Sequence, residues 1–270
     1  MKKEFPETNF EETERKTIIR YKNGTKTETN DIVASETIIK ITLQCELIGT
    51  LSCTPSDIRD LVAGYLISSG IIWEKNKLVH VEYIPDKQTF DVSLENNKVL
   101  SEYGYSVIQP VGCTSGNSIF IKVEHENRKL SKISLEASKI SHLMKEFHKI
   151  SELFRATGGV HSAALADGNE IIVFREDVGR HNAVDKVFGY LYLNNESIDD
   201  KILLTSGRIS SEVVMKSNNA GVQIIISRSA PTLKGIELAE KYNITLVGFA
   251  RRNNFNIYSS SERIDFQNEN

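Results

Sequence analysis

The chain has 270 residues, of which 40% are hydrophobic and 26% are charged, and its formal net charge is −3. These values are typical of a globular protein and argue against a dedicated nucleic-acid-binding protein, while leaving room for a local basic pocket that takes a phosphorylated ligand. Three cysteines without a C-x-x-C spacing argue against a disulfide scaffold and a cysteine-built zinc site.

The first part of the chain predicts a disordered tail over residues 1–15, followed by a smaller α+β domain over residues 16–110. The tail is polar and lacks the apolar segment of a signal peptide, and no run approaches the roughly 20 apolar residues that cross a bilayer. With three unpaired cysteines, this predicts a cytoplasmic protein. Runs rich in β-branched residues predict strands at 17–21, 32–45, 46–53, 79–84 and 89–94.

Two short signals in this first domain predict a turn and a helix. Asn23-Gly24 predicts a turn between the first two strands. Thr54-Pro55 combines an N-cap residue with proline at the first helical position, so it predicts a helix that begins at Thr54 and ends near Gly70.

The second part, residues 111–258, predicts an α/β domain, and residues 259–270 predict a polar tail. An amphipathic pattern predicts a helix over residues 134–154. Short apolar runs then predict strands at 171–174, 202–205, 223–227 and 245–249, alternating with helices that begin near Asn182, Ser210 and Leu233. This alternation predicts a three-layer α/β/α domain with a largely parallel sheet.

Cys113 is the candidate nucleophile, because it lies between two glycines in Gly112-Cys113-Thr114-Ser115-Gly116. Glycines allow the backbone to approach another molecule closely, and an accessible thiol can carry a sulfane sulfur as a persulfide. The alternative is a small buried hydrophobic residue, which is the interpretation we give to Cys45 and Cys53 in their strand-like surroundings.

Polar segments rich in glycine and arginine precede or follow the predicted strands. In a parallel α/β sheet such segments meet along one edge, where ligands bind. Guanidinium groups suit phosphates, and carboxylates suit the N–H edge of a guanine. Each segment alone would also be an ordinary connecting loop or, for the histidines, a structural side chain. The candidate ligand-binding residues are Gly159, His161, Arg175, Glu176, Asp177, Arg180, His181, Asn182, Ser206, Gly207, Arg208, Ser229, Thr232, Phe249, Ala250, Arg251, Arg252, Asn253 and Asn254.

Together these segments resemble the FdhD family of formate dehydrogenase accessory proteins, over about residues 54–258. The most specific stretches are 157–161, 175–182 with Asp185-Lys186, 206–208, 229–232 and 246–249. The resemblance implies a cytidine-deaminase-like fold without zinc and a sulfur carrier, or sulfurtransferase, that acts as a homodimer. It implies that Cys113 receives sulfur from a cysteine desulfurase as a persulfide. It also implies that residues 249–254 bind the acceptor, a molybdenum bis-molybdopterin guanine dinucleotide cofactor destined for formate dehydrogenase. A guanine nucleotide is then a partial mimic of that cofactor.

The sequence departs from the family in one place, and two other functions stay open. Some members carry C-x-x-C where this chain has Cys113 and Gly116, so a resolving disulfide between those positions is impossible. A zinc-dependent deaminase needs H-x-E and P-C-x-x-C, but His161 is followed by Ser162 and Ala163, and there is no C-x-x-C. The other alternative is a chaperone that binds the molybdenum cofactor without sulfur chemistry.

Overall fold

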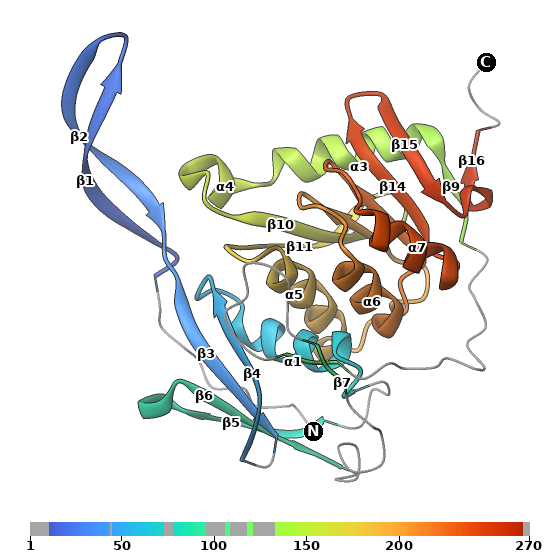
Figure 1. The fold of residues 1–270 in the computed structure, drawn as a ribbon, viewed down its shortest axis with the longest axis horizontal. Helices are drawn as coiled ribbons and strands as arrows, with labels where there is room; N and C mark the ends of the chain where they lie inside the picture. Colours follow the sequence, from blue (N-terminus) through green and yellow to red (C-terminus); the bar gives the residue numbers. More distant parts are fainter. Residues whose placement is uncertain are drawn as a thin grey trace.

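A computed structural model describes residues 11–43, 45–72, 78–95, 106–108, 118–120 and 133–266, and the statements below concern these ranges (Figure 1). Two sheets dominate the fold, one with six strands and one with four. Cys113 lies outside the described residues.

The larger sheet is mixed, with the strand order β11-β10-β12-β13-β14-β15. Strands β12, β13 and β14 are parallel, whereas β10, β11 and β15 pair antiparallel with their neighbours, so the expectation of a largely parallel sheet was wrong. The sequence analysis missed β10 and β15, because the first is short and alanine-rich and the second is polar. The strands are β10 His161–Ala166, β11 Ile171–Asp177, β12 Ile202–Thr205, β13 Ile224–Ser227, β14 Thr245–Arg251 and β15 Asn254–Ser259.

Helices cover both faces of this sheet, which confirms the three-layer α/β/α arrangement (Figure 1). Alternate residues of β10 show the division: Ala163 and Leu165 join the core beneath α5, α6 and α7, whereas Ala164 and Ala166 join the core beneath α3. The helix predicted over residues 134–154 is divided between α3 and α4. The helices are α3 Ala137–Lys149, α4 Glu152–Thr157, α5 Arg180–Leu193, α6 Ser211–Ala220 and α7 Leu233–Lys241.

The smaller sheet has the order β4-β3-β6-β5, and helix α1 shares its apolar core. Helix α1 begins at Ile58 rather than at Thr54, because the Thr54 hydroxyl accepts a hydrogen bond from the backbone N–H of Val178 (3.0 Å) instead of capping a helix. The elements are β3 Thr37–Leu43, β4 Glu46–Cys53, α1 Ile58–Ser68, β5 Leu78–Ile84, the 3₁₀ turn η1 Pro85–Lys87 and β6 Thr89–Leu94.

Helices α1 and α5 cross at two glycines, and this contact joins the two sheets into one body. A Cβ atom on Gly64 would lie 1.7 Å from the carbonyl oxygen of Asp185, and one on Gly189 would lie 1.9 Å from that of Asp60. The backbones therefore touch where no side chain fits. The helix of the predicted smaller domain thus packs directly on a helix of the α/β domain.

The outer segments differ from the predicted tails. Strand β1 begins at Thr13, inside the expected disordered tail, and forms a long hairpin with β2 around the predicted Asn23-Gly24 turn. Near the other end of the chain, Ile264 is 5% exposed in the core beneath α3, so residues 259–266 are part of the fold. The remaining elements are β1 Thr13–Lys22, β2 Thr25–Ala34, β7 Ser106–Ile108, β8 Ser118–Phe120, β9 Leu135–Glu136, the 3₁₀ turn η2 Ser261–Arg263 and β16 Ile264–Asp265.

We expect Gly64→Ala and Gly189→Ala each to lower the free energy of unfolding by about 2–3 kcal/mol or more, because the added methyl group meets backbone that has little room to move. Urea unfolding followed by circular dichroism measures this. Gly159→Ala is the matched control, since its Cβ would meet Ala34 at an ordinary 3.5 Å. Equal stability of all three variants would contradict the close crossing.

Candidate functional site

One edge of the six-stranded sheet collects most of the predicted polar segments. Strands β11, β12, β13 and β14 end there, and β10 begins there because it runs antiparallel to β12. We call this edge the strand-end row and define it as residues 161–162, 177–182, 205–210, 227–229 and 249–252.

Hydrogen bonds connect neighbouring segments of the row. The Ser206 hydroxyl accepts from the backbone N–H of Ser162 (2.9 Å), and the Ser227 hydroxyl donates to the carbonyl of Gly207 (2.6 Å). Further along, the backbone N–H of Phe249 donates to the carbonyl of Ser229 (3.1 Å). The structure therefore brings these loops into one continuous surface.

The centre of the row combines a partly buried guanidinium with a glycine that leaves it space. The Arg180 side chain lies on Gly207, where an added Cβ would be 3.1 Å from the Arg180 Cβ and 3.2 Å from its Cδ. The Nε of Arg180 is buried and has no hydrogen-bond partner among the described residues. Next to it, Arg208 is exposed. A buried donor without a partner is costly, so Arg180 is the candidate in this row for contact with an anion.

Two helices begin beside Arg180 and add to the positive potential. Helix α5 follows Gly179 and helix α6 follows Ser210. Neither of these N-cap residues makes a side-chain capping hydrogen bond among the described residues, although Asp177 accepts from the backbone N–H of Gly179 (2.8 Å). Unsatisfied backbone N–H groups and the helix dipole favour anions at such ends. The row can therefore hold a phosphate between two arginines and two helix N-termini.

Both histidines of the row are held neutral at neutral pH. Burial, with Arg180 as the next cause, lowers the pKa of His161, whose Nδ1 lies 3.5 Å from the Ser206 hydroxyl. Burial and then the Lys216 ammonium lower the pKa of His181 well below its usual value. The 3.4 Å contact between His181 Nε2 and Glu212 Oε2 is therefore not an ion pair, and the hydrogen-bond partner of this nitrogen is the Ser210 hydroxyl (3.4 Å).

Asp177 and Asn182, which were predicted to bind a ligand, instead connect the two halves of the fold. Asp177 forms an ion pair with Lys186 (2.7 Å), and both side chains are fully buried. The Asp177 carboxylate also accepts a hydrogen bond from the backbone N–H of Thr54 (3.1 Å). The Asn182 amide donates to Asp177 (2.9 Å) and to the carbonyl of Ser52 (2.7 Å).

Three other predicted ligand-binding side chains also have structural partners. Arg175 forms an ion pair with Asp60 (2.7 Å). Glu176 accepts from the backbone N–H groups of Leu153 (2.9 Å) and Phe154 (3.0 Å) at the start of α4. Thr232 caps α7 by accepting from the N–H of Gly235 (3.1 Å). These side chains hold the scaffold of the row.

The segment from Phe249 to Asn254 closes one end of the row. Phe249 is 43% exposed in a left-handed conformation with φ 53°, and Ala250 is buried. Arg251 pairs with Asn254 in the hairpin between β14 and β15, so Arg252 and Asn253 form its exposed turn. Elsewhere, Ser229 is half-buried in the row, and Gly159 is exposed just before it. The exposed polar groups of this turn are accessible to a ligand.

The three cysteines differ in their surroundings. Cys113 lies outside the described residues, but the short strands β7 and β8 on either side of it pair, with Ile108 opposite Ser118. Cys53 is fully buried, and burial raises its pKa to about 12, so its thiol is inert at neutral pH. Cys45, which was expected to be buried, is exposed in the turn between β3 and β4.

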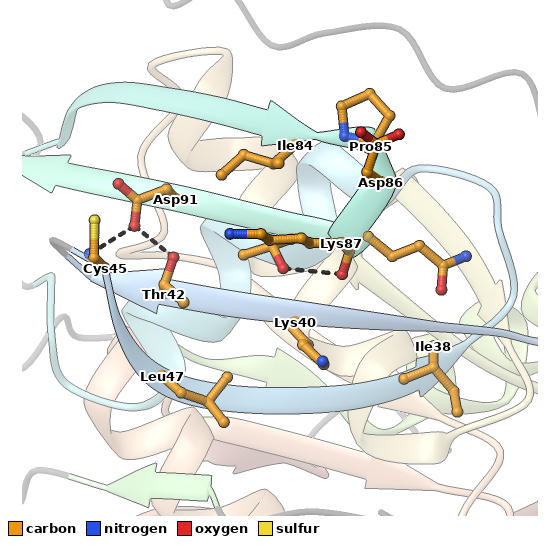
Figure 2. Close-up of a pocket in the computed structure, with 12 residues that line it drawn as sticks. Ile38, Lys40, Thr42, Cys45, Leu47, Ile84, Pro85, Asp86, Lys87 and Asp91 are labelled. Atoms are coloured by element: carbon orange, nitrogen blue, oxygen red, sulfur yellow. Dashed lines mark hydrogen bonds between the residues drawn. The ribbon is translucent and has the colours of Figure 1, made fainter.

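A groove also lies elsewhere, on the outer face of the four-stranded sheet (Figure 2). It measures about 900 Å³ and includes Cys45, whose backbone N–H donates to Asp91 (2.9 Å). Its other lining side chains are a mixture of aliphatic, lysine and aspartate groups, and none belongs to the strand-end row. The row, which has convergent cations and a partly buried unpaired donor, is the better candidate site.

Comparison with known proteins identifies the family. The sequence profile of the FdhD/NarQ family matches residues 34–265. The chain belongs to this family. Sulfur carrier protein FdhD from Staphylococcus aureus strain MRSA252 is 38% identical over 252 residues, which cover 92% of this chain and 94% of that protein. The protein of the same name from strain Newman is 37% identical with the same coverage.

A solved structure extends this family relation to the fold. The crystal structure of a proposed formate dehydrogenase accessory protein from Desulfotalea psychrophila superimposes with a TM-score of 0.75 at 27% sequence identity. The match covers 94% of this chain and 99% of that chain. No helix within the described ranges is both long and apolar enough to cross a membrane. Within the same ranges, no three His, Cys, Asp or Glu side chains gather to hold a metal ion.

Sequence reasoning missed several residues that shape the site. Glu212 and Ser210 both lie 3.4 Å from His181, and Lys216 forms a buried ion pair with Asp185 (2.8 Å). The sequence predicted a helix start near Ser210, but it gave no sign that Ser210 and Glu212 would contact His181. No pattern indicated the partner of Lys216, because the two residues lie on different helices.

We expect Asp177→Ala to destabilise the protein by about 3–5 kcal/mol, because it leaves the fully buried Lys186 ammonium without its partner. Thermal and urea unfolding measure the change. Glu240→Ala on exposed α7 is the control and should stay within about 0.5 kcal/mol of the wild type. An Asp177 variant of native stability with weakened ligand binding would contradict the structural role.

Proposed function

We propose that this protein is a sulfur carrier that takes sulfur from a cysteine desulfurase as a persulfide on Cys113. It passes the sulfur to a molybdenum bis-molybdopterin guanine dinucleotide cofactor before that cofactor enters formate dehydrogenase. Membership of the FdhD/NarQ family and the relatives named sulfur carrier protein FdhD support the general role. The fold shared with a formate dehydrogenase accessory protein supports the acceptor enzyme. A cytoplasmic location fits a carrier that needs a free thiolate.

The unpaired Nε of Arg180 is the observation that carries the cofactor proposal. A phosphate oxygen of the dinucleotide satisfies this donor, and Arg208 and the N-termini of α5 and α6 supply further positive potential. Glycine at position 207 leaves room for the Arg180 side chain, because any side chain at this position would meet the aliphatic part of Arg180. The residues present therefore fit a pyrophosphate-bearing substrate.

The phosphates are the part of the cofactor that the row supports best. Asp177 and Glu176 were expected to recognise the guanine edge, but both carboxylates already accept hydrogen bonds from the protein backbone. Polar groups of the exposed 251–254 turn remain accessible for the base. Affinity therefore depends on the arginines, with the guanine contributing through that turn.

The sulfur step assigned to Cys113 is a simple exchange. Its thiolate attacks the outer sulfur of the donor persulfide, the new S–S bond forms as the old one breaks, and the donor cysteine leaves as a thiolate. Gly116 leaves no neighbouring thiol to resolve the persulfide. Release then depends on the acceptor, on an external thiol or on a more distant cysteine.

A cofactor chaperone without sulfur transfer is the second candidate. The observation that favours it is that the row is built from residues that do not include Cys113, so it can bind a dinucleotide by itself. Persulfide mass spectrometry after incubation with a desulfurase and cysteine separates the two functions.

We expect Cys113→Ala to abolish persulfide formation and formate dehydrogenase maturation while guanine-nucleotide binding persists, because the thiol and the row are separate groups. Mass spectrometry, an activity assay and calorimetry with GDP measure the three properties. Cys45→Ala, which removes the exposed thiol of the described residues, is the control and should retain all of them. Full maturation by the Cys113 variant would rule out the relay.

We expect Arg180→Gln to weaken GDP binding about 10- to 100-fold, the effect of losing charged hydrogen bonds to a phosphate. Isothermal titration calorimetry with the full chain measures this, and Arg20→Gln on the distant β1–β2 hairpin is the matched control. Undiminished affinity in the Arg180 variant would show that phosphate binds elsewhere.

A further inference from the structure

His161 is the first residue of β10 and lies in the strand-end row beside Arg180. It pairs across the sheet with Asp177, whose carboxylate accepts from the backbone N–H of the residue directly before Arg180 (2.8 Å). On its other side the ring contacts Ser206, and the next residue, Gly207, lies against the Arg180 side chain. Contacts through β11 and contacts through β12 therefore place the His161 ring next to the same guanidinium.

One nitrogen of the His161 ring has a partner and the other does not. Nδ1 lies 3.5 Å from the Ser206 hydroxyl, which already accepts from the backbone N–H of Ser162 (2.9 Å). Nε2 has no hydrogen-bond partner within the described ranges, and the residue is half-buried rather than sealed in the core. A hydroxyl has one donor and two acceptor positions. Ser206 can therefore donate to a neutral ring or accept from a protonated one, so it fits both charge states.

The groups around this ring disfavour its protonation. Burial is the largest cause that lowers the pKa of His161, and the guanidinium groups of Arg180 and Arg208 also lower it. Asp177 acts in the opposite direction, but its carboxylate is already compensated by Lys186 at 2.7 Å. Two of the groups that keep the ring neutral are thus the same arginines that make the row attractive to an anion.

An anion between Arg180 and Arg208 changes this balance. It offsets the two positive charges that oppose protonation and adds a negative charge that favours the imidazolium. We propose that His161 takes up a proton when the strand-end row binds the pyrophosphate of its ligand, so that its imidazolium becomes a third cation of the site. Because it concerns the same site, this coupling rests on the proposed function, to which it adds a dependence on pH.

The second histidine of the row does not suit this role. His181 is 4% exposed, and its Nε2 already lies 3.4 Å from the Ser210 hydroxyl. After burial, the largest cause that lowers its pKa is Lys216, which is buried and paired with Asp185 (2.8 Å). An anion in the row offsets that inner charge less than it offsets Arg180, so His181 stays neutral.

The coupling has a definite sign. His161 binds its proton more tightly in the complex than in the free protein, so a lower pH favours the complex. Between the pKa of this histidine in the free protein and its higher pKa in the complex, affinity falls as the pH rises, by at most about tenfold per pH unit for one proton. Outside that window His161 contributes no pH dependence.

Nitrogen-15 NMR of the histidine rings in the full-length protein reads the protonation of His161 directly. The ligand is diguanosine pyrophosphate, whose bridging phosphates exchange no proton near neutral pH. At about pH 7 we expect the His161 ring to change from imidazole to imidazolium as the protein is saturated, whereas the His181 ring stays neutral. His161→Gln assigns the signal. A His161 ring that remains neutral in the complex would overturn the inference.

Calorimetry with the same ligand from about pH 6 to about pH 8 measures the coupling as affinity. The dissociation constant of the wild type should rise about tenfold over this range, whereas that of His161→Gln should change less than about twofold. His80→Gln, on an exposed part of β5, is the matched control and should follow the wild type. Circular dichroism checks that each variant folds.

The outcomes separate this inference from the proposed function. If diguanosine pyrophosphate binds with the same affinity at every pH, or if His161→Gln keeps the full pH dependence, the proton coupling is wrong and the cofactor site stands. If the wild type does not bind diguanosine pyrophosphate at all, the proposed cofactor site fails and the coupling fails with it.

Discussion

The contact between helices α1 and α5 is the constraint on which the rest of the structure depends. Two glycines allow the helix backbones to touch, and the four-stranded sheet is thereby fixed on the α/β domain. Around this crossing, Asp177, Lys186 and Thr54 form a fully buried polar network that spans both halves. The same network holds the start of α5, so the packing of the two halves sets the position of Arg180 beside Gly207.

The polar segment 175–182 therefore contains both side chains that hold the fold together and a candidate ligand-binding side chain. Side chains of the 175–182 segment that point inward are used by the fold, whereas Arg180 faces the row with an unpaired donor. The same segment contains the start of α5, and the loop after β12 adds Arg208 and leads into the start of α6.

Much of the fold was predictable from local sequence patterns. The Glu46–Cys53 and Thr89–Leu94 strands and the Asn23-Gly24 turn occur where the pattern of β-branched residues and turn signals placed them. Strand β10 was missed because its alanines carry little strand preference and its partners are distant in sequence. The start of α1 was misplaced because Thr54 serves a long-range contact with Val178, which no local pattern contains.

For the site, the sequence located the loops but could not tell binding residues from structural ones. In the sequence, a charged residue that binds a ligand looks the same as one that pairs with another side chain. Arg180 is proposed to contact a ligand, whereas Asp177 pairs with the buried Lys186. This similarity has a consequence for genetics. A screen that scores only formate-dependent growth would rank Asp177, Asn182 and Gly189 with Arg180 as essential, although the first three maintain the fold. Measuring protein abundance alongside growth would separate the two groups, so that lost chemistry is not confused with clearance of misfolded chains.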